Sequence, residues 1–166
     1  REMKMKKKLV GVSVALMLVA SLTLAGCGGK TAEDPLADGV LKIGTNATYV
    51  PFEYRDENNE MVGFDIDMGN AIAEELGVKA EWVDTGFDGI FNGLTSNQYE
   101  MIIAGTSITE ERQKTFNMSS PYTANGIVIV SRNDGTPAKT ADDLKGKKVG
   151  VQIETTSDYA AEKMIE

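Results

Sequence analysis

Short apolar runs recur along residues 40–166, each closed by a glycine or a polar turn. Such runs are typical of buried strands. They occupy the segments 40–44, 101–104, 127–130 and 149–151. Alternation of apolar and polar positions predicts a further strand over 78–83, and the segments 52–54 and 61–62 flank a polar run that indicates a hairpin-like excursion.

Apolar positions three and four residues apart predict helices between these strands. Asp65 is the expected cap of a helix that continues to Leu76, and its acidic neighbour Asp67 is expected with it on a charged surface. Thr109 is a second predicted cap, with acidic residues in the first turn that follows. Further helical segments are expected at 88–94, at 142–144 and from a Thr155 cap to Met164.

Alternating strands and helices predict an α/β fold with a largely parallel sheet. Ligands of such sheets bind beyond the carboxyl ends of the strands. The turns expected there are 46–49, 86–87, 105–109 and 152–156.

The first 26 residues have the pattern of a secretion signal, with a basic run at Lys4–Lys8, an apolar stretch and small residues at its end. The end, Leu24-Ala-Gly-Cys27, resembles the lipobox of bacterial lipoproteins, which implies lipid on the Cys27 sulfur and an anchored protein outside the cytoplasmic membrane. An uncleaved anchor helix is the alternative, and it implies the same side of the membrane. Residues 27–39 contain little that could pack and predict a flexible tether.

Composition excludes several classes of function. The chain has 17 basic and 25 acidic residues, and five of the basic ones lie in the predicted signal, so the remainder is acidic enough to repel nucleic acid. It has no histidine, which excludes histidine-based nucleophile pairs and histidine-ligated zinc. With a single cysteine and no nucleotide-binding glycine motif, we expect no cofactor and no metal. The acidic run 56–60 lacks the spacing of a calcium loop and is interpreted as a solvated turn.

The segment Gly105-Thr-Ser-Ile-Thr-Glu-Glu-Arg112 is the most informative local motif. Free amides at a helix start, a hydroxyl and a guanidinium together suit a carboxylate. An ordinary capped helix with a solvent-facing arginine explains the same pattern. Phe87 and Tyr49, at expected strand ends, fit either a ligand sandwich or simple packing.

Six segments in this order resemble one known family. They are 41–54, 62–67, 87–90, 103–105, 108–112 and 143–151. Together they resemble the polar amino-acid branch of the extracytoplasmic solute-binding proteins that serve ABC importers. The resemblance implies a periplasmic-binding-protein-like, two-lobed clamp, of which this chain holds the first lobe and the start of the second as an N-terminal fragment. Lobe one would cover 40–121, the hinge crossing 122–126 and the start of lobe two 127–166.

The same resemblance assigns ligand-binding roles. Arg112 and the Ser107 amide would hold the α-carboxylate of an amino acid, while the Gly105 carbonyl would accept from its ammonium group with help from the Ser107 hydroxyl. Phe87 and Tyr49 would flank the ligand side chain, and Asn46 would read its far end. The closing contacts from lobe two would be Thr155 and Thr156, beside which Glu154 replaces the usual glycine.

The implied protein is a monomeric receptor that captures a polar L-amino acid for ABC permease subunits and performs no catalysis. Two alternatives stay open. An enzyme on the same scaffold, related to dehydratases or peptidoglycan-lytic proteins, would have to use a carboxylic acid such as Glu154. A surface interaction module with a degenerate cleft is the other.

Overall fold

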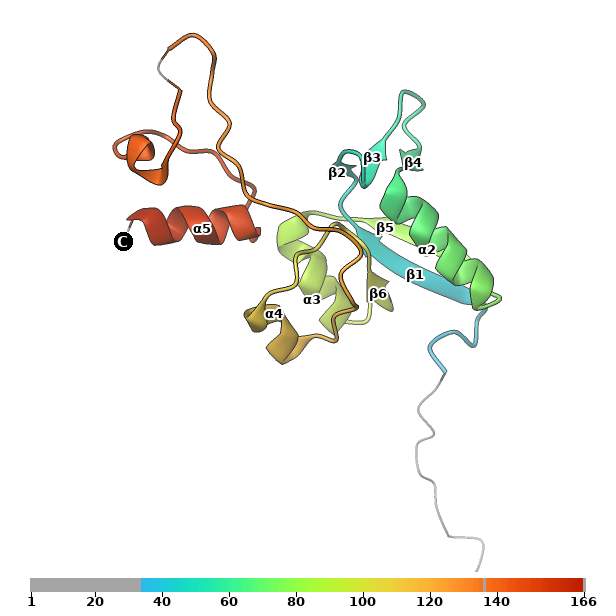
Figure 1. The fold of residues 1–166 in the computed structure, drawn as a ribbon. Helices are drawn as coiled ribbons and strands as arrows, with labels where there is room; N and C mark the ends of the chain where they lie inside the picture. Colours follow the sequence, from blue (N-terminus) through green and yellow to red (C-terminus); the bar gives the residue numbers. More distant parts are fainter. Residues whose placement is uncertain (1–33, 136, 166) are drawn as a thin grey trace, which may run out of the picture. The chain divides into compact units, whose positions relative to one another are not determined.

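A computed structural model describes residues 34–135 and 137–165 (Figure 1). The predicted signal peptide, Cys27 and the start of the predicted tether lie outside the described residues. The end of that tether takes part in the fold, because Leu36 packs against the hydrophobic core. Within the described ranges, none of the helices is long and apolar enough to cross a membrane.

A parallel sheet of three strands forms the centre of the fold. Strand β1 (Val40–Thr45) lies between β5 (Lys79–Asp84) and β6 (Met101–Ile102). Thr45 pairs with Asp84, so β1 and β5 end at the same level. Ile43 and Gly44 pair with β6. The predicted parallel α/β sheet is confirmed, and its carboxyl ends bring the turns after β1, β5 and β6 together.

Helices cover both faces of this sheet. On one face, α2 (Phe64–Glu75) packs on β1 and β5 and closes a core that includes Ile43 and Ala73. On the other face, the 3-10 turn η1 (Phe87–Gly89) leads into α3 (Ile90–Thr95), which buries Ile90 and Tyr99. Strands covered on both faces tend to be apolar, as the short apolar runs of β1 and β6 illustrate. Strand β5 alternates instead, with Lys79 and Glu81 exposed.

The polar excursion after β1 is a small antiparallel sheet, as predicted. Its strands are β2 (Thr48–Tyr49), β3 (Glu53–Arg55) and β4 (Met61–Val62). This sheet supplies the start of α2, because Pro51 and Phe52 accept hydrogen bonds from the first amides of the helix through their carbonyl oxygens. The prediction that Asp65 caps α2 is therefore wrong. The N-cap is Gly63. An Asp65 cap would satisfy an amide two or three residues further on, and the Asp67 amide already donates to the Gly63 carbonyl.

The remaining elements are α4 (Glu110–Thr115), the 3-10 turn η2 (Ala141–Leu144) and α5 (Thr156–Ile165). The Thr109 hydroxyl accepts from the Arg112 amide at 3.2 Å, which confirms the predicted cap of α4. The Thr155 hydroxyl accepts from the Asp158 amide at 3.2 Å and so stands at the start of α5, as expected.

Two predicted strands, 127–130 and 149–151, do not form in the described part of the chain. Their apolar side chains are exposed, with Val128 at 77% and Val130 at 89%. An apolar run predicts burial, but a strand also needs a neighbour with which to exchange main-chain hydrogen bonds. The described residues offer these two segments no such neighbour.

Candidate functional site

A pocket of about 660 Å³ lies at the carboxyl ends of the parallel strands. Its wall includes residues from the turns after β1, β5 and β6 and from the start of α5. All eight residues predicted to contact a ligand line it: Asn46, Tyr49, Phe87, Gly105, Ser107, Arg112, Thr155 and Thr156. The structure thus brings together residues that are more than 100 positions apart in sequence, while their contacts with a ligand stay predictions.

Arg112 places a positive charge in the pocket wall, and several contacts hold its side chain. Its side chain is 7% exposed, which contradicts the alternative of a solvent-facing arginine. The guanidinium lies over the rings of Phe87 and Phe91, 5.6 and 4.9 Å from their centroids. Nη1 donates to the Ser107 carbonyl at 2.9 Å. Burial lowers the pKa of Arg112, but an arginine stays charged at any physiological pH, so a fixed positive charge faces the pocket.

Glu154 contacts this arginine through its main chain. The Glu154 carbonyl accepts from Arg112 Nη2 at 3.0 Å, and its backbone has a φ of 65°. The Glu154 carboxylate is engaged elsewhere, because it accepts from the Tyr159 hydroxyl at 2.7 Å. The carboxylate of Glu154 is thereby held by α5.

Gly105 and Tyr49 are in close contact at the pocket wall. Gly105 has a φ of 52°, and a Cβ built on it would lie 2.8 Å from the Tyr49 ring. The Tyr49 ring packs against Phe52, and its hydroxyl accepts from the Asn125 side chain. A ring that is 38% exposed and fixed on both sides offers a flat apolar surface next to the Gly105 main chain.

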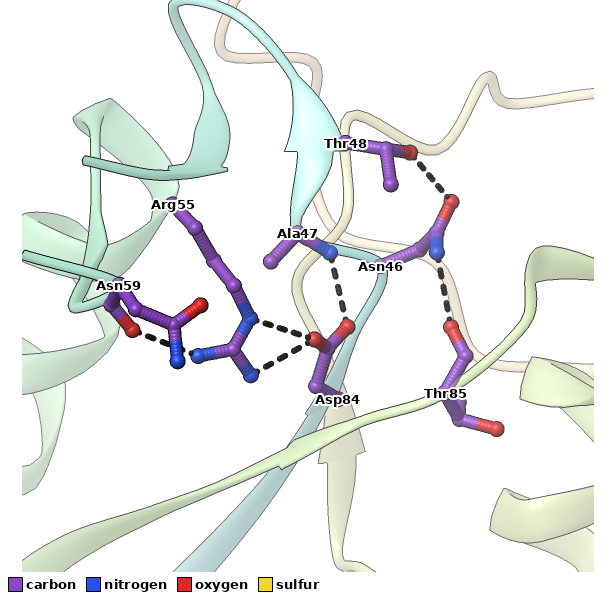
Figure 2. A network of polar contacts seen from close by, with 7 residues as sticks. All are labelled: Asn46, Ala47, Thr48, Arg55, Asn59, Asp84 and Thr85. Atoms are coloured by element: carbon purple, nitrogen blue, oxygen red, sulfur yellow. Dashed lines mark hydrogen bonds and ion pairs between the residues drawn. The ribbon is translucent and has the colours of Figure 1, made fainter. Parts of the chain in front are cut away.

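The Asn46 amide is held by three hydrogen bonds. Its nitrogen donates to the Thr85 carbonyl at 2.9 Å, and its oxygen accepts from the Thr48 hydroxyl at 2.9 Å (Figure 2). The same oxygen accepts from Gln152 Nε2 at 2.9 Å. These contacts fix which end of the amide faces which neighbour, so the pocket presents a neutral, oriented polar group at this position.

Asp84 supports the turn that carries Asn46. Its carboxylate accepts from the Ala47 amide at 3.0 Å and pairs with Arg55 at 2.9 Å (Figure 2). Arg55 also donates to the Asn59 carbonyl at 2.9 Å. The end of β5 is therefore tied to both the small sheet and the Asn46 turn.

The pocket wall near Gly105 contains an acidic group that the sequence pattern does not reveal. Glu53 lines the pocket and is only 1% exposed, although it lies in a strand between two aromatic residues, where alternation favours a solvent-facing position. Asp65 is fully buried beside it, so the prediction of a charged surface at Asp65 is also wrong. Burial and Asp65 together raise the pKa of Glu53 to about 9.

Comparison with known proteins places this architecture among binding proteins. Residues 41–163 match the bacterial extracellular solute-binding proteins of family 3. The L-cystine-binding protein TcyJ of Escherichia coli K12 is 35% identical over 90% of this chain and 57% of its own length. The ABC transporter arginine-binding protein 1 of the same organism is 36% identical over 85% of this chain and 55% of its own length.

Solved structures agree with the sequence relatives. An ancestral arginine-binding protein bound to arginine is 48% identical, with a TM-score of 0.73 over 76% of this chain and 56% of that one. The ancestral amino acid-binding protein AncCDT-1, a precursor of cyclohexadienyl dehydratase, is 40% identical, with a TM-score of 0.71 over 76% of this chain and 57% of that one. The chain thus spans little more than half the length of the proteins it matches.

Proposed function

Because the chain belongs to the bacterial extracellular solute-binding proteins of family 3, we propose that it forms the ligand-capturing part of a receptor that delivers a polar L-amino acid to an ABC importer. Its fold is the first lobe and part of the second lobe of a two-lobed periplasmic-binding-protein-like clamp. We place lobe one at 40–121, the crossing at 122–126 and the second lobe from 127 onward.

The fixed guanidinium of Arg112 is the observation that carries the proposal. A free amino acid presents a carboxylate, which a planar guanidinium binds with two parallel hydrogen bonds. Two N–H groups of Arg112 donate to the carbonyls of Ser107 and Glu154, and the others are the donors that the carboxylate would take. The Ser107 amide would be its second partner.

The ammonium group of the ligand needs hydrogen-bond acceptors. The Gly105 carbonyl and the Ser107 hydroxyl would accept from the ammonium group, since both residues line the pocket beside Arg112. The rings of Phe87 and Tyr49 would enclose the ligand side chain. Burying a zwitterion is costly unless both charges are matched, and these positions supply the match.

The ligand class follows from the polar end of the pocket. Asn46 is neutral and oriented by Thr85, Thr48 and Gln152, so it would hydrogen-bond a polar side chain without demanding a charged one. Relatives are described as binding cystine and arginine, and these ligands share only their α-ammonium and α-carboxylate groups. We therefore assign a polar L-amino acid as the ligand class.

Closure of the clamp would complete the site. Thr155 and Thr156 line the pocket and would add a hydroxyl and an amide to the ligand carboxylate from the second lobe. Binding would then favour the closed form, because only that form offers contacts from both lobes. The permease subunits would recognise the closed form of this monomeric receptor.

An extracytoplasmic location would agree with the family, which is described as extracellular. Lipid on Cys27 would anchor the receptor to the membrane, at the cell surface or in the periplasm, with the residues between Cys27 and Leu36 as spacer. Acyl-chain labelling of the full-length protein, with Cys27→Ser as the control, tests the anchor directly. Label that persists in the variant would contradict it.

Thermal unfolding of the full-length protein with each of the twenty amino acids tests the function. One polar amino acid should stabilise it by about 2.7 kcal/mol at a concentration 100-fold above the Kd. Arg112→Ala should abolish this gain, and Arg112→Lys should retain only part of it, because lysine lacks the planar fork. Lys114→Ala, on the same helix and exposed, is the matched control and should respond like the wild type.

An enzyme on the same scaffold is the second candidate, because AncCDT-1 is a precursor of a dehydratase. Glu154 would be its acid, and turnover of a cyclic carboxylic acid that Glu154→Gln removes would support it. An interaction module would show no response to any small ligand. Neither candidate uses the buried, aromatic-stacked Arg112 as directly as amino-acid binding does.

A further inference from the structure

Next to Gly105, two buried acids, Glu53 and Asp65, form a cluster with the partly exposed Tyr122. The three side chains come from separate parts of the chain. Asp65 belongs to α2, Glu53 to β3, and Tyr122 to the segment that follows α4. One oxygen of Asp65 accepts from the Gly105 amide at 2.7 Å and from the Tyr122 hydroxyl at 2.9 Å. A single carboxylate oxygen thus ties the pocket wall to the start of the proposed hinge crossing.

The cluster contains two acceptors that lack donors. Within the described residues, Glu53 Oε2 and the second oxygen of Asp65, Oδ1, are buried without a hydrogen-bond partner. Asp65 is one of the groups that raise the pKa of Glu53, so the two carboxyl groups are neighbours. Two adjacent buried carboxylates cannot both be ionised at moderate cost, and one proton between them would satisfy both orphaned oxygens.

The surroundings decide which group holds the proton. Asp65 Oδ2 accepts two hydrogen bonds, whereas Glu53 Oε2 accepts none. The titratable groups that face Glu53 are Asp65 from α2 and Tyr122 from the segment after α4, and neither is a cation. A single proton between the two acids would therefore sit on Glu53 and point toward Asp65.

We propose that Glu53 and Asp65 share a single proton, and that through it they position the Gly105 main chain and Tyr122 for binding of the ammonium end of the amino acid. This inference rests on the proposed function. Glu53 and Asp65 are positioning residues, since they act on the ligand through Gly105. Loss of the shared proton would place two negative charges side by side and loosen the hold of Asp65 on Gly105.

Burial explains why this proton persists at neutral pH, because the pKa of Glu53 is raised to about 9. We therefore expect affinity to depend on pH in the alkaline range. The ammonium group of a free amino acid titrates in a similar range, so the measurement needs an internal comparison. Glu53→Gln supplies it, because glutamine keeps the neutral shape of the acid and cannot lose a proton.

The experiment measures the Kd of the stabilising amino acid by calorimetry on the full-length protein and its variants, from about pH 7 to about pH 10. Relative to Glu53→Gln, the wild type should lose affinity as the pH rises through about 9, while titration of the ligand cancels in the ratio. Asp65→Asn should weaken binding at least about tenfold at pH 7, because a charged hydrogen-bond acceptor is lost.

Two further variants separate positioning from folding. Asp67→Asn makes the same change two residues along α2 on an exposed side chain, and should bind like the wild type. Tyr122→Phe removes only a hydroxyl, so it should fold even where Asp65→Asn does not, and it should weaken binding through the same contact.

Each outcome is decisive. A constant ratio of Kd values for the wild type and Glu53→Gln across the pH range would overturn the shared proton. Wild-type affinity in folded Asp65→Asn, or in Tyr122→Phe where Asp65→Asn does not fold, would overturn the positioning role. If the wild type itself binds none of the twenty amino acids, the proposed function fails and the positioning role falls with it.

Discussion

Gly105 lies in the pocket wall at a position that favours glycine. Its positive φ is accessible to glycine without strain, and its missing side chain leaves room for the Tyr49 ring. The Gly105 amide donates a hydrogen bond to Asp65, which holds its main chain in place. The Gly105 carbonyl is proposed to face the ligand. Backbone conformation and close contact with Tyr49 both favour glycine here.

Gly105→Ala should therefore cost both stability and affinity. A methyl group would meet the Tyr49 ring at 2.8 Å and force an unfavourable φ, so we expect a loss of unfolding free energy of about 1–3 kcal/mol. Denaturant unfolding measures this loss. Gly126→Ala is the control, because no atom lies within 4 Å of the added Cβ. Equal stability of the two variants would contradict the close contact.

Helix α4 matters through its first turn. The cap at Thr109 and the guanidinium of Arg112 belong to the same six-residue helix, and the capped amide is that of Arg112 itself. A helix this short depends on its cap, because it has few internal hydrogen bonds. The cap consequently fixes the main chain from which Arg112 reaches over Phe87 and Phe91.

Thr109→Ala should lower the free energy of unfolding by about 1 kcal/mol, as is usual for the loss of an N-cap hydroxyl. Thr109→Ser retains the hydroxyl and should restore most of it. Chemical denaturation of both variants checks the difference. A more telling sign would be weaker amino-acid binding in Thr109→Ala alone, whereas unchanged stability would mean that the cap contributes nothing.

At the scale of the whole molecule, the buried Glu53 should couple folding to pH. Its pKa is about 9 in the folded protein, against 4.5 without burial, so the folded state keeps a proton that the unfolded state releases. Stability from this group is complete below about pH 4.5 and is lost as the pH rises toward 9. The slope is at most about 1.4 kcal/mol per pH unit for one proton.

Unfolding free energies of the wild type and Glu53→Gln, measured in denaturant between about pH 5 and about pH 9, check this coupling. The wild type should lose stability relative to the variant as the pH rises, since glutamine carries no proton to release. Parallel pH curves for the two proteins would show that Glu53 is ionised in the folded state. No ligand is needed, so this result is independent of the amino acid that binds.

Much of the architecture could be predicted from the sequence, because the signals are local. Apolar runs gave β1 and β6, alternation gave β5, and Thr109 and Thr155 marked the starts of their helices. The residues that line the pocket were also predictable, since strand ends in a parallel sheet meet at one edge and the resemblance named the positions there.

Only the tertiary structure decided the roles that depend on distant neighbours. Residues 127–130 are apolar but form no strand, because a strand needs a partner that local pattern cannot supply. Asp65 and Glu53 have the charge of surface residues, yet a helix and a strand bury them together under Gly105. Burial and hydrogen bonding are properties of the assembled chain, so the protonation of this pair could not be predicted from residue type alone.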